Sequence, residues 1–282
     1  MRLQVATLML FACASAGHGQ TEAQGPVVGV GPFLHMVADL DKSIAFYRDA
    51  LGLKLNGPEG DHPFNSNPAV ANLYGVPGKQ FRAAVLSIPG TGMGIELAQW
   101  HGLESSTSGN PEIATLILKV SDREAFETRV GAKNRVLRDP DGFPIELVEA
   151  ATAASNSGGI AGADLRINTA DQEGTSARLA RVFGFTPGPR PEELEIPGSS
   201  VGITLADGQA SDGLGAPFPA PGYGMLRLRV RDIEAVAKAC QLAGFKVITT
   251  EGNPVDLPGG ARAIIVRDPA GFYFQPFEPA RK

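Results

Sequence analysis

The sequence predicts an α+β protein built from four similar strand-helix-strand units, and three observations lead to this fold class. First, 35 Gly and 22 Pro are 57 of the 282 residues, about a fifth of the chain against roughly an eighth in ordinary proteins, which disfavours a helical bundle. Second, the hydrophobic fraction of 43% is high enough for a packed core. Third, segments of the first half recur in the second half, which indicates duplication.

The repeat is carried by three pairs of segments, two of them close matches. An Arg-Asp-Pro-x-Gly-Phe frame recurs, and so does a frame of apolar, basic, Val, x, Asp, x, Glu, Ala. The pairs are 138–147 (RDPDGFPIEL) with 267–276 (RDPAGFYFQP), 118–126 (LKVSDREAF) with 228–236 (LRVRDIEAV) and, more weakly, 35–53 with 167–185.

A polar, uncharged stretch at residues 151–160 (ATAASNSGGI) has no apolar periodicity and is predicted to be a linker. About two domains are expected at this length. The linker leaves an N-terminal domain at residues 28–150 and a C-terminal domain at residues 161–279, each with two of the four units. The repeat pattern leaves open whether units pair within a half or across the halves.

The first unit begins with a strand and a helix. Residues 35–53 pass from an apolar strand through Asp39 and Asp41, both candidate N-caps, into a helix over residues 42–51. Gly52 follows as the helix terminator.

Strand-like runs separated by Gly and Pro follow each helix, for example residues 82–88 and 92–100. In two Ile-Glu-Leu frames, alternation places Ile and Leu on one face of the strand and Glu96 or Glu146 on the other. A sheet packed on a helix should bury Ile and Leu. Each carboxylate then faces the opposite side, where it needs a metal ion, a hydrogen-bond donor or water. The alternative is that both glutamates simply face solvent.

Two motifs then point to a family. H-x-V-x-D-L-x-x-S-I-x-F-Y-x-x-x-L-G-L (residues 35–53) and D-P-D-G-x-x-I-E-L (residues 139–147), together with the fourfold pattern, resemble the vicinal oxygen chelate superfamily. This superfamily includes glyoxalase I, extradiol dioxygenases, bleomycin and fosfomycin resistance proteins and methylmalonyl-CoA epimerase. The resemblance implies four βαβββ modules that form two glyoxalase-like domains, with sheets curled around cups.

The resemblance also implies a metal site. In metal-dependent members the first and fourth strands of a module supply ligands, and in the first half these positions fall on His35, Glu96, Thr115 and Glu146. We therefore expect a divalent ion (Fe, Mn, Ni, Co or Zn) on His35, Glu96 and Glu146, with Glu146 as the catalytic residue that moves a proton. Thr115 departs from the pattern because neutral Thr is a poor ligand. A strand histidine such as His35 can instead be a hydrogen-bonded core residue.

The second half has lost the ligand pattern, so no metal is expected there. Its corresponding positions are Ile167, Thr204, Met225 and Gln275. Weaker candidates for substrate contacts are Thr115 and Trp100, together with His62 and Tyr74, which lie in the long segment 57–80. Packing within their own loops is the alternative for the aromatic residues.

Two functions from different classes follow. The first is a divalent-metal-dependent enzyme of the isomerase, lyase or dioxygenase type, acting on a small oxygen-chelating metabolite. The alternative is a metal-free module that binds and sequesters a small molecule, as the bleomycin resistance proteins do; a scaffold with vestigial cups is a third reading. The net charge of −5 argues against a nucleic-acid partner. A homo-oligomer is compatible with the sequence.

The N-terminal residues are predicted to be a signal peptide. Arg2, an apolar run at residues 3–12 and Ala-Ser-Ala at residues 14–16 define it as residues 1–16, so the protein is expected to be exported to the periplasm or secreted. Cys13 within a lipobox-like LFAC gives a lipoprotein as the second alternative. The run is too short to span a bilayer, and no membrane span is expected.

Overall fold

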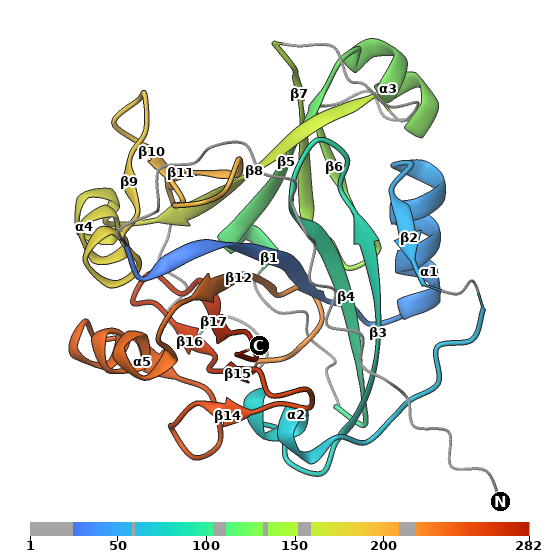
Figure 1. Ribbon diagram of the computed structural model, residues 1–282. Coiled ribbons are helices and arrows are strands. Elements are labelled where there is room, and N and C mark those ends of the chain that lie inside the picture. Colours follow the sequence, from blue (N-terminus) through green and yellow to red (C-terminus); the bar gives the residue numbers. More distant parts are fainter. Residues whose placement is uncertain are drawn as a thin grey trace, which may run out of the picture.

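The computed structural model describes residues 25–57, 60–103, 111–131, 135–151, 159–208 and 218–281. The strands form two mixed sheets with helices packed against them, as expected for an α+β protein (Figure 1). The predicted signal peptide, Cys13 and residues 152–158 of the predicted linker lie outside the described residues.

Sheet A has the strand order β13-β16-β17-β12-β1-β4-β3-β2, with β14 and β15 attached at its side. Its strands are β1 (Val27–Met36), β2 (Lys54–Asn56), β3 (Gln80–Ser87), β4 (Gly94–His101), β12 (Gly224–Val230), β13 (Lys246–Val247), β14 (Val255–Asp256), β15 (Arg262–Ala263), β16 (Val266–Arg267) and β17 (Tyr273–Glu278).

Sheet B has the strand order β6-β7-β5-β8-β11-β10-β9. Its strands are β5 (Ala114–Val120), β6 (Val136–Arg138), β7 (Pro144–Glu149), β8 (Ile160–Thr169), β9 (Thr186–Pro187), β10 (Glu193–Glu195) and β11 (Gly202–Asp207).

Four modules follow one another along the chain, and each sheet combines one module from each half. Module 1 (β1–β4) pairs with module 4 (β12–β17) through β1 and β12, where His35 lies opposite Gly224. Module 2 (β5–β7) pairs with module 3 (β8–β11) through β5 and β8, where Thr115 lies opposite Arg166. The two halves of the sequence therefore do not form separate sheets. This pairing across the halves, which the repeat left open, places Glu96 and Glu146 in different sheets.

The helices α1, α3, α4 and α5 begin directly after an aspartate, and α2 begins after Asn67. Asp39, Asp122, Asp171 and Asp232 each cap a helix by accepting a hydrogen bond from a backbone N–H three residues on. In the first module Asp39, not Asp41, is the cap. The helical segments are α1 (Leu40–Ala45), continued by the π-helical turn η1 (Phe46–Ala50), α2 (Pro68–Leu73), the short 3₁₀ turn η2 (Pro111–Ile113), α3 (Arg123–Val130), α4 (Gln172–Phe183) and α5 (Ile233–Leu242).

One core joins the helix-bearing faces of both sheets. α1 packs on β3 and β4, α3 on β7, α4 on β11 and α5 on β17. As predicted, Ile and Leu of both Ile-Glu-Leu frames are fully buried in this core, which draws residues from both sheets. We call the opposite faces of the two sheets face A and face B. They carry Glu96 and Glu146.

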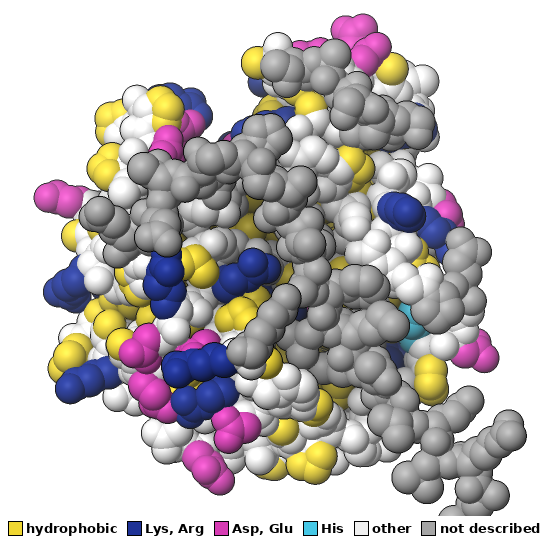
Figure 2. All heavy atoms as spheres, viewed as in Figure 1, with side chains coloured by type: hydrophobic (Ala, Val, Ile, Leu, Met, Phe, Trp, Pro, Cys, Tyr) yellow, Lys and Arg dark blue, Asp and Glu magenta, His cyan; other side chains and the backbone are white. Residues whose placement is uncertain are grey.

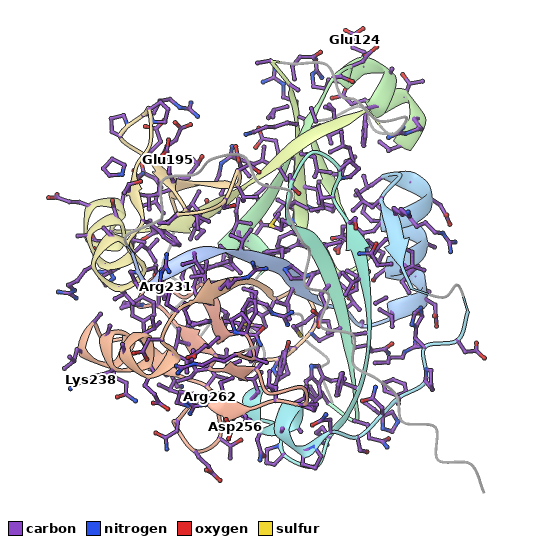
Figure 3. The ribbon with its side chains drawn as sticks, viewed as in Figure 1. Glu124, Glu195, Arg231, Lys238, Asp256 and Arg262 are labelled. Carbon is purple, nitrogen blue, oxygen red and sulfur yellow. The ribbon has the colours of Figure 1, made fainter. Side chains whose placement is uncertain are left out.

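Many charged side chains lie on the outside of the molecule. Glu124 on α3, Glu195 on β10 and Lys238 on α5 are exposed (Figure 3). On the side viewed in Figure 2, basic and acidic side chains are interspersed. Among the described residues, no helix combines the length and apolar character needed to cross a bilayer.

Candidate functional site

His35 and Glu96 lie on opposite faces of sheet A. In the parallel pair of β1 and β4, Leu34 lies beside Glu96 and His35 beside Leu97, so Leu34 is the β1 residue that faces the same side as Glu96. His35 points into the shared core and is fully buried. The predicted first-strand position is therefore displaced by one residue, which in a strand moves a side chain to the other face.

Hydrogen bonds hold His35 in the core. Its Nε2 lies 2.6 Å from Oδ2 of Asp139, and its Nδ1 lies 3.2 Å from the carbonyl oxygen of Tyr223. Because a carbonyl only accepts, Nδ1 carries a proton. Asp139 comes from the turn between β6 and β7, so the contact joins the two sheets. Tyr47 donates its hydroxyl to the same Oδ2 at 3.0 Å.

The pair is arranged as an imidazolium and a carboxylate. Burial by itself lowers the pKa of His35, but the charge and hydrogen bond of Asp139 outweigh it, so this pKa is raised. Burial raises the pKa of Asp139, yet the charge and hydrogen bond of His35, with a backbone hydrogen bond from Phe143, bring this pKa below its ordinary value. Both shifts favour the charged forms.

His35, Asp139 and Asp141 are the one group of three potential ligands within 4.8 Å of one another in the described part of the chain. The group does not suit a divalent ion, because two ligands on one ion lie about 3 Å or more apart while His35 Nε2 and Asp139 Oδ2 are 2.6 Å apart. Asp139 Oδ1 already accepts the backbone N–H groups of Asp141 and Phe143. The group is a hydrogen-bonded connection between modules 1 and 2.

On face A an arginine binds both residues at the fourth-strand ligand positions. Nη1 of Arg227 lies 3.1 Å from Oε2 of Glu96, and its Nε donates to Oε1 of Gln275 at 3.1 Å. Glu96 comes from module 1, whereas Arg227 and Gln275 come from module 4. The side chain of Arg227 is 17% exposed. Its guanidinium lies between the two groups that would hold an ion.

On face B the same pairing recurs. Arg166 of β8 donates from Nη1 to Oε2 of Glu146 on β7. Arg166 precedes Ile167, the predicted first-strand position, so the one-residue displacement seen at His35 is repeated here. Thr115 and Thr204 lie directly across from Arg166 on the two neighbouring strands. An arginine thus occupies a ligand position itself.

Neither face offers a donor set for a divalent ion. The ligand positions are Leu34, Glu96, Met225 and Gln275 on face A, and Thr115, Glu146, Arg166 and Thr204 on face B. Each set contains one carboxylate, paired with a guanidinium that repels a second cation, whereas an ion in a protein typically needs three or more donors. The predicted set of His35, Glu96 and Glu146 does not converge, because the three side chains lie in the core, on face A and on face B.

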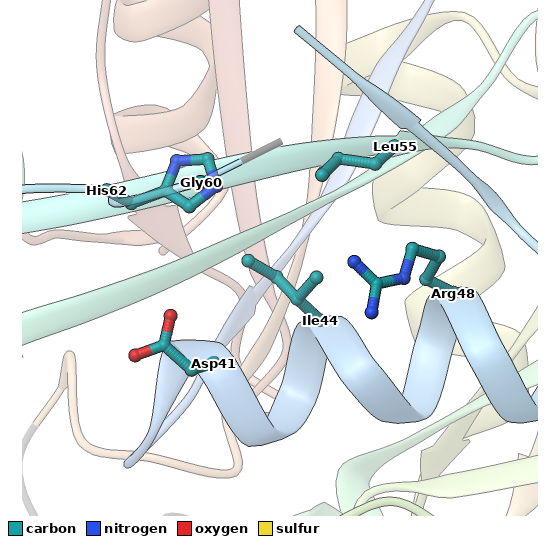
Figure 4. Close-up of a pocket in the computed structure, with 6 residues that line it drawn as sticks. All are labelled: Asp41, Ile44, Arg48, Leu55, Gly60 and His62. Carbon is teal, nitrogen blue, oxygen red and sulfur yellow. The ribbon is translucent and has the colours of Figure 1, made fainter. Parts of the chain in front are cut away.

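The remaining predicted residues fall in three places. Tyr74 and Trp100 are buried together on face A, with ring centroids 5.0 Å apart. Thr115 lies on face B. His62 lines a pocket of about 200 Å³ on the outside of α1 (Figure 4). The pocket residues are Asp41, Ile44, Arg48, Leu55, Gly60 and His62, none of which occupies a ligand position.

Arg227 and Arg166 are the residues that sequence reasoning missed. A signal for Arg227 exists in Gly31 on the neighbouring strand β1. A Cβ at Gly31 would lie 2.7 Å from Cδ and 2.9 Å from Cγ of Arg227, so the glycine makes room for this side chain. A second signal is the presence of charged residues at alternate positions of β8 (Asp164 and Arg166) and of β12 (Arg227 and Arg229), where the other residues are mostly apolar.

Known proteins with a similar fold were found by comparison of sequence and structure. Residues 33–62 match the bleomycin resistance protein-like N-terminal family. Glyoxalase I from Zea mays is similar in structure, with a TM-score of 0.56, 17% identity and coverage of 90% of this chain and 92% of that chain. A proposed dioxygenase from Bacillus subtilis gives a TM-score of 0.58 at 16% identity, over 90% of this chain and 86% of that chain. A search of curated proteins gave no match.

The fold is that of the vicinal oxygen chelate superfamily, so the resemblance predicted from the two motifs is confirmed at the level of structure. At these identities the likeness describes the fold alone, because one fold hosts several chemistries.

Proposed function

We propose that the protein is a metal-independent binding protein for a small molecule, with its ligand site on face B. The observation that carries this proposal is that each glutamate at a ligand position is paired with an arginine from the partner module. A guanidinium stands where metal-dependent relatives would need a cation. This favours the sequestering function over the metal-dependent enzyme.

Of the two faces, face B is the more exposed to solvent. The side chains of Arg166 and Lys119 are 31% and 38% exposed, and those of Glu146 and Asp164 are 17% and 23% exposed. Lys119 and Asp164 form a second ion pair at 2.6 Å. Face A, by contrast, is covered by apolar side chains of α2 and of the segment before β12.

The chemistry of face B suits an anion, and a carboxylate above all. Arg166 uses Nη1 for Glu146, which leaves Nε and Nη2 without a partner among the described residues. The hydroxyls of Thr115 and Thr204 flank Arg166 and likewise have no partner in the described part of the chain. A guanidinium binds a carboxylate through two parallel hydrogen bonds, and the threonines add two donors beside it.

The test is ligand-dependent thermal stabilisation in the presence of excess chelator. We expect small carboxylic acids, screened at millimolar concentration, to raise the melting temperature of the wild-type protein. Arg166→Met should abolish the shift, because the guanidinium is the anchor. The matched control is Arg262→Met, which removes a similarly exposed arginine from ion pairs with Glu234 and Asp256 away from face B and should leave the shift unchanged.

Two results would count against this function. One is a shift that disappears in chelator, which would restore a metal-dependent site. The other is a shift of equal size in wild-type protein and Arg166→Met.

We also propose that the chain is exported after cleavage behind Ala16. The support is the sequence of residues 2–16 alone. N-terminal sequencing of the protein recovered from the cell envelope and from the cytoplasm tests it, and a blocked, lipid-modified Cys13 would select the lipoprotein alternative.

A further inference from the structure

The pocket beside α1 lies on the helix-bearing side of sheet A, away from the ligand positions of both faces. We call it the α1 pocket. Asp41, Ile44 and Arg48 form one wall, because residues three and four apart lie on the same side of a helix. Leu55 of β2 and His62 of the following segment lie across from them (Figure 4). At about 200 Å³ the pocket is smaller than the roughly 300–1,000 Å³ of sites for drug-sized ligands, so it suits a small metabolite.

The middle of the α1 pocket is apolar. Ile44 is 6% exposed and belongs to the shared core, and Leu55 packs against the same core. A ligand that covers these two side chains needs a hydrocarbon segment at its centre, because polar groups there would lose their water without gaining a partner.

Opposite charges border the two ends of this apolar floor. Asp41 and Arg48 are two helical turns apart, roughly 10 Å along the axis. In Figure 4 the carboxylate of Asp41 points toward His62, and the guanidinium of Arg48 points toward Ile44. A molecule lying along the helix therefore meets a negative group at one end and a positive group at the other.

Each of the two charges is held in place from outside the pocket. Oδ2 of Asp41 lies 3.0 Å from Nη2 of Arg82, whose Nε donates to Oε1 of Gln99 at 2.8 Å. Nε and Nη2 of Arg48 donate to the carboxylate of Asp49 at 2.6 and 2.8 Å, so Asp49 takes one edge of the guanidinium. Charged groups that are already positioned lose less conformational entropy when a ligand binds.

His62 adds hydrogen-bonding capacity at the Asp41 end. Neither ring nitrogen of His62 has a hydrogen-bond or ion-pair partner in the described part of the chain, and no described residue donates a hydrogen bond to Oδ1 of Asp41. A neutral imidazole offers one acceptor nitrogen, and a carboxylate oxygen accepts as well. Two acceptors, one of them charged, are suited to an ammonium group.

We infer that the α1 pocket binds a small amino acid as its zwitterion. The ammonium group lies between Asp41 and His62, the hydrocarbon segment covers Ile44, and the carboxylate lies at Arg48. An acid without the amine, or an amine without the acid, satisfies only one end. The pocket shares no residue with face B, so the inference stands apart from the function proposed for that face.

Calorimetric titration of the full-length protein tests the inference. The titrants are alanine, β-alanine and 4-aminobutyrate, which differ in the distance between their two charges. Each is compared with the acid and the amine of the same carbon chain: propionate and propylamine, or butyrate and butylamine. The comparison is made in Arg166→Met as well as in the wild type, because face B is proposed to bind carboxylates. In Arg166→Met we expect at least one amino acid to bind at one molecule per chain, about tenfold or more tighter than its acid and its amine.

Two substitutions then assign the binding to the pocket. Asp41→Asn and Arg48→Met should each weaken binding of the amino acid about tenfold or more, because each removes a charged hydrogen-bonding partner. Circular dichroism checks that both variants are folded. The matched controls are Asp256→Asn and Arg262→Met, which break an exposed aspartate–arginine pair elsewhere in module 4 and should leave the affinity unchanged.

Three results would overturn the inference: no amino acid binds more tightly than its acid and its amine, the affinity is unchanged in both Asp41→Asn and Arg48→Met, or binding disappears in Arg166→Met. In the last case the amino acid occupies face B, and the function proposed for that face stands. Conversely, if carboxylic acids fail to stabilise the wild-type protein while the amino acid binds and depends on Asp41, the face B proposal fails and this inference stands.

Discussion

At the scale of single residues, His35 shows how one position can be noticed for the right reason and given the wrong role. A histidine on a buried strand needs partners for both ring nitrogens. Asp139 and the Tyr223 carbonyl provide them in the core. The motif D-P-D-G therefore serves a hydrogen-bonded connection between modules: its first aspartate binds the first residue of the opening motif.

The connection gives the protein a defined pH dependence. The pKa of Asp139 is lowered, so its contribution is present above about 3.9 and is lost as the pH falls through the folded-state pKa. The pKa of His35 is raised, so its contribution is present below about 6.5 and is lost as the pH rises through its higher folded-state pKa. The pair therefore stabilises most between these limits.

We expect Asp139→Asn to lower the free energy of unfolding by about 3 kcal/mol between pH 4 and 6.5, because it removes the charged partner of the buried His35 ring. The difference from wild-type protein should shrink on both sides of this range. Urea unfolding at a series of pH values measures it, with Asp256→Asn, which breaks an exposed pair with Arg262, as the control. A difference that stays constant across the whole pH range would contradict this assignment.

At the scale of secondary-structure elements, most of the fold follows from local sequence. The aspartate before each of α1, α3, α4 and α5, the Ile-Glu-Leu frames and the glycine after the first helix all have the roles that their chemistry indicates. The register of β1 could not be predicted from its sequence, because the strand has apolar residues on both faces: Phe33 on one, and Leu34 and Met36 on the other. With no alternation, nothing in the sequence shows which face carries His35.

Gly31 tests the element-scale explanation of Arg227. A methyl group at this position collides with the Arg227 side chain and should displace the guanidinium from Glu96. We expect Gly31→Ala to lower the free energy of unfolding by about 1–3 kcal/mol. Gly92→Ala is the control, because a Cβ there meets nothing within 4 Å.

A double-mutant cycle with Arg227→Met tests the cause of the Gly31→Ala effect more directly. If the collision is the cause, Gly31→Ala should cost less in the Arg227→Met background than in wild-type protein. Equal costs in both backgrounds would mean that the glycine acts through the backbone instead.

At the scale of the whole molecule, pairing across the halves decides what the ligand positions can do. Modules 1 and 4 share sheet A, and modules 2 and 3 share sheet B. Duplication was visible in the sequence, but the partner of each module depends on non-local strand pairing, of β1 with β12 and of β5 with β8. This is why Glu96 and Glu146, alike in their local frames, belong to different faces, and why their arginine partners could not be assigned from local pattern.

The same pairing predicts how the chain behaves when divided. Residues 25–151 and 159–281 produced separately should each lack a stable fold, since β1 loses β12 and β8 loses β5. Mixed in equal amounts, they should associate and regain the circular dichroism spectrum of the intact protein. A cooperative unfolding transition in either half alone would contradict this account.

The central claim is that arginine guanidinium groups take the place of a divalent ion at the ligand positions. Calorimetric titration of chelator-treated protein with Zn²⁺ and Co²⁺ tests it most directly, in the wild type and in Glu96→Gln and Glu146→Gln. The account predicts that neither glutamate substitution alters metal binding, whatever weak surface sites the titration reveals. Stoichiometric binding with micromolar or tighter affinity that disappears in Glu96→Gln or Glu146→Gln would contradict it.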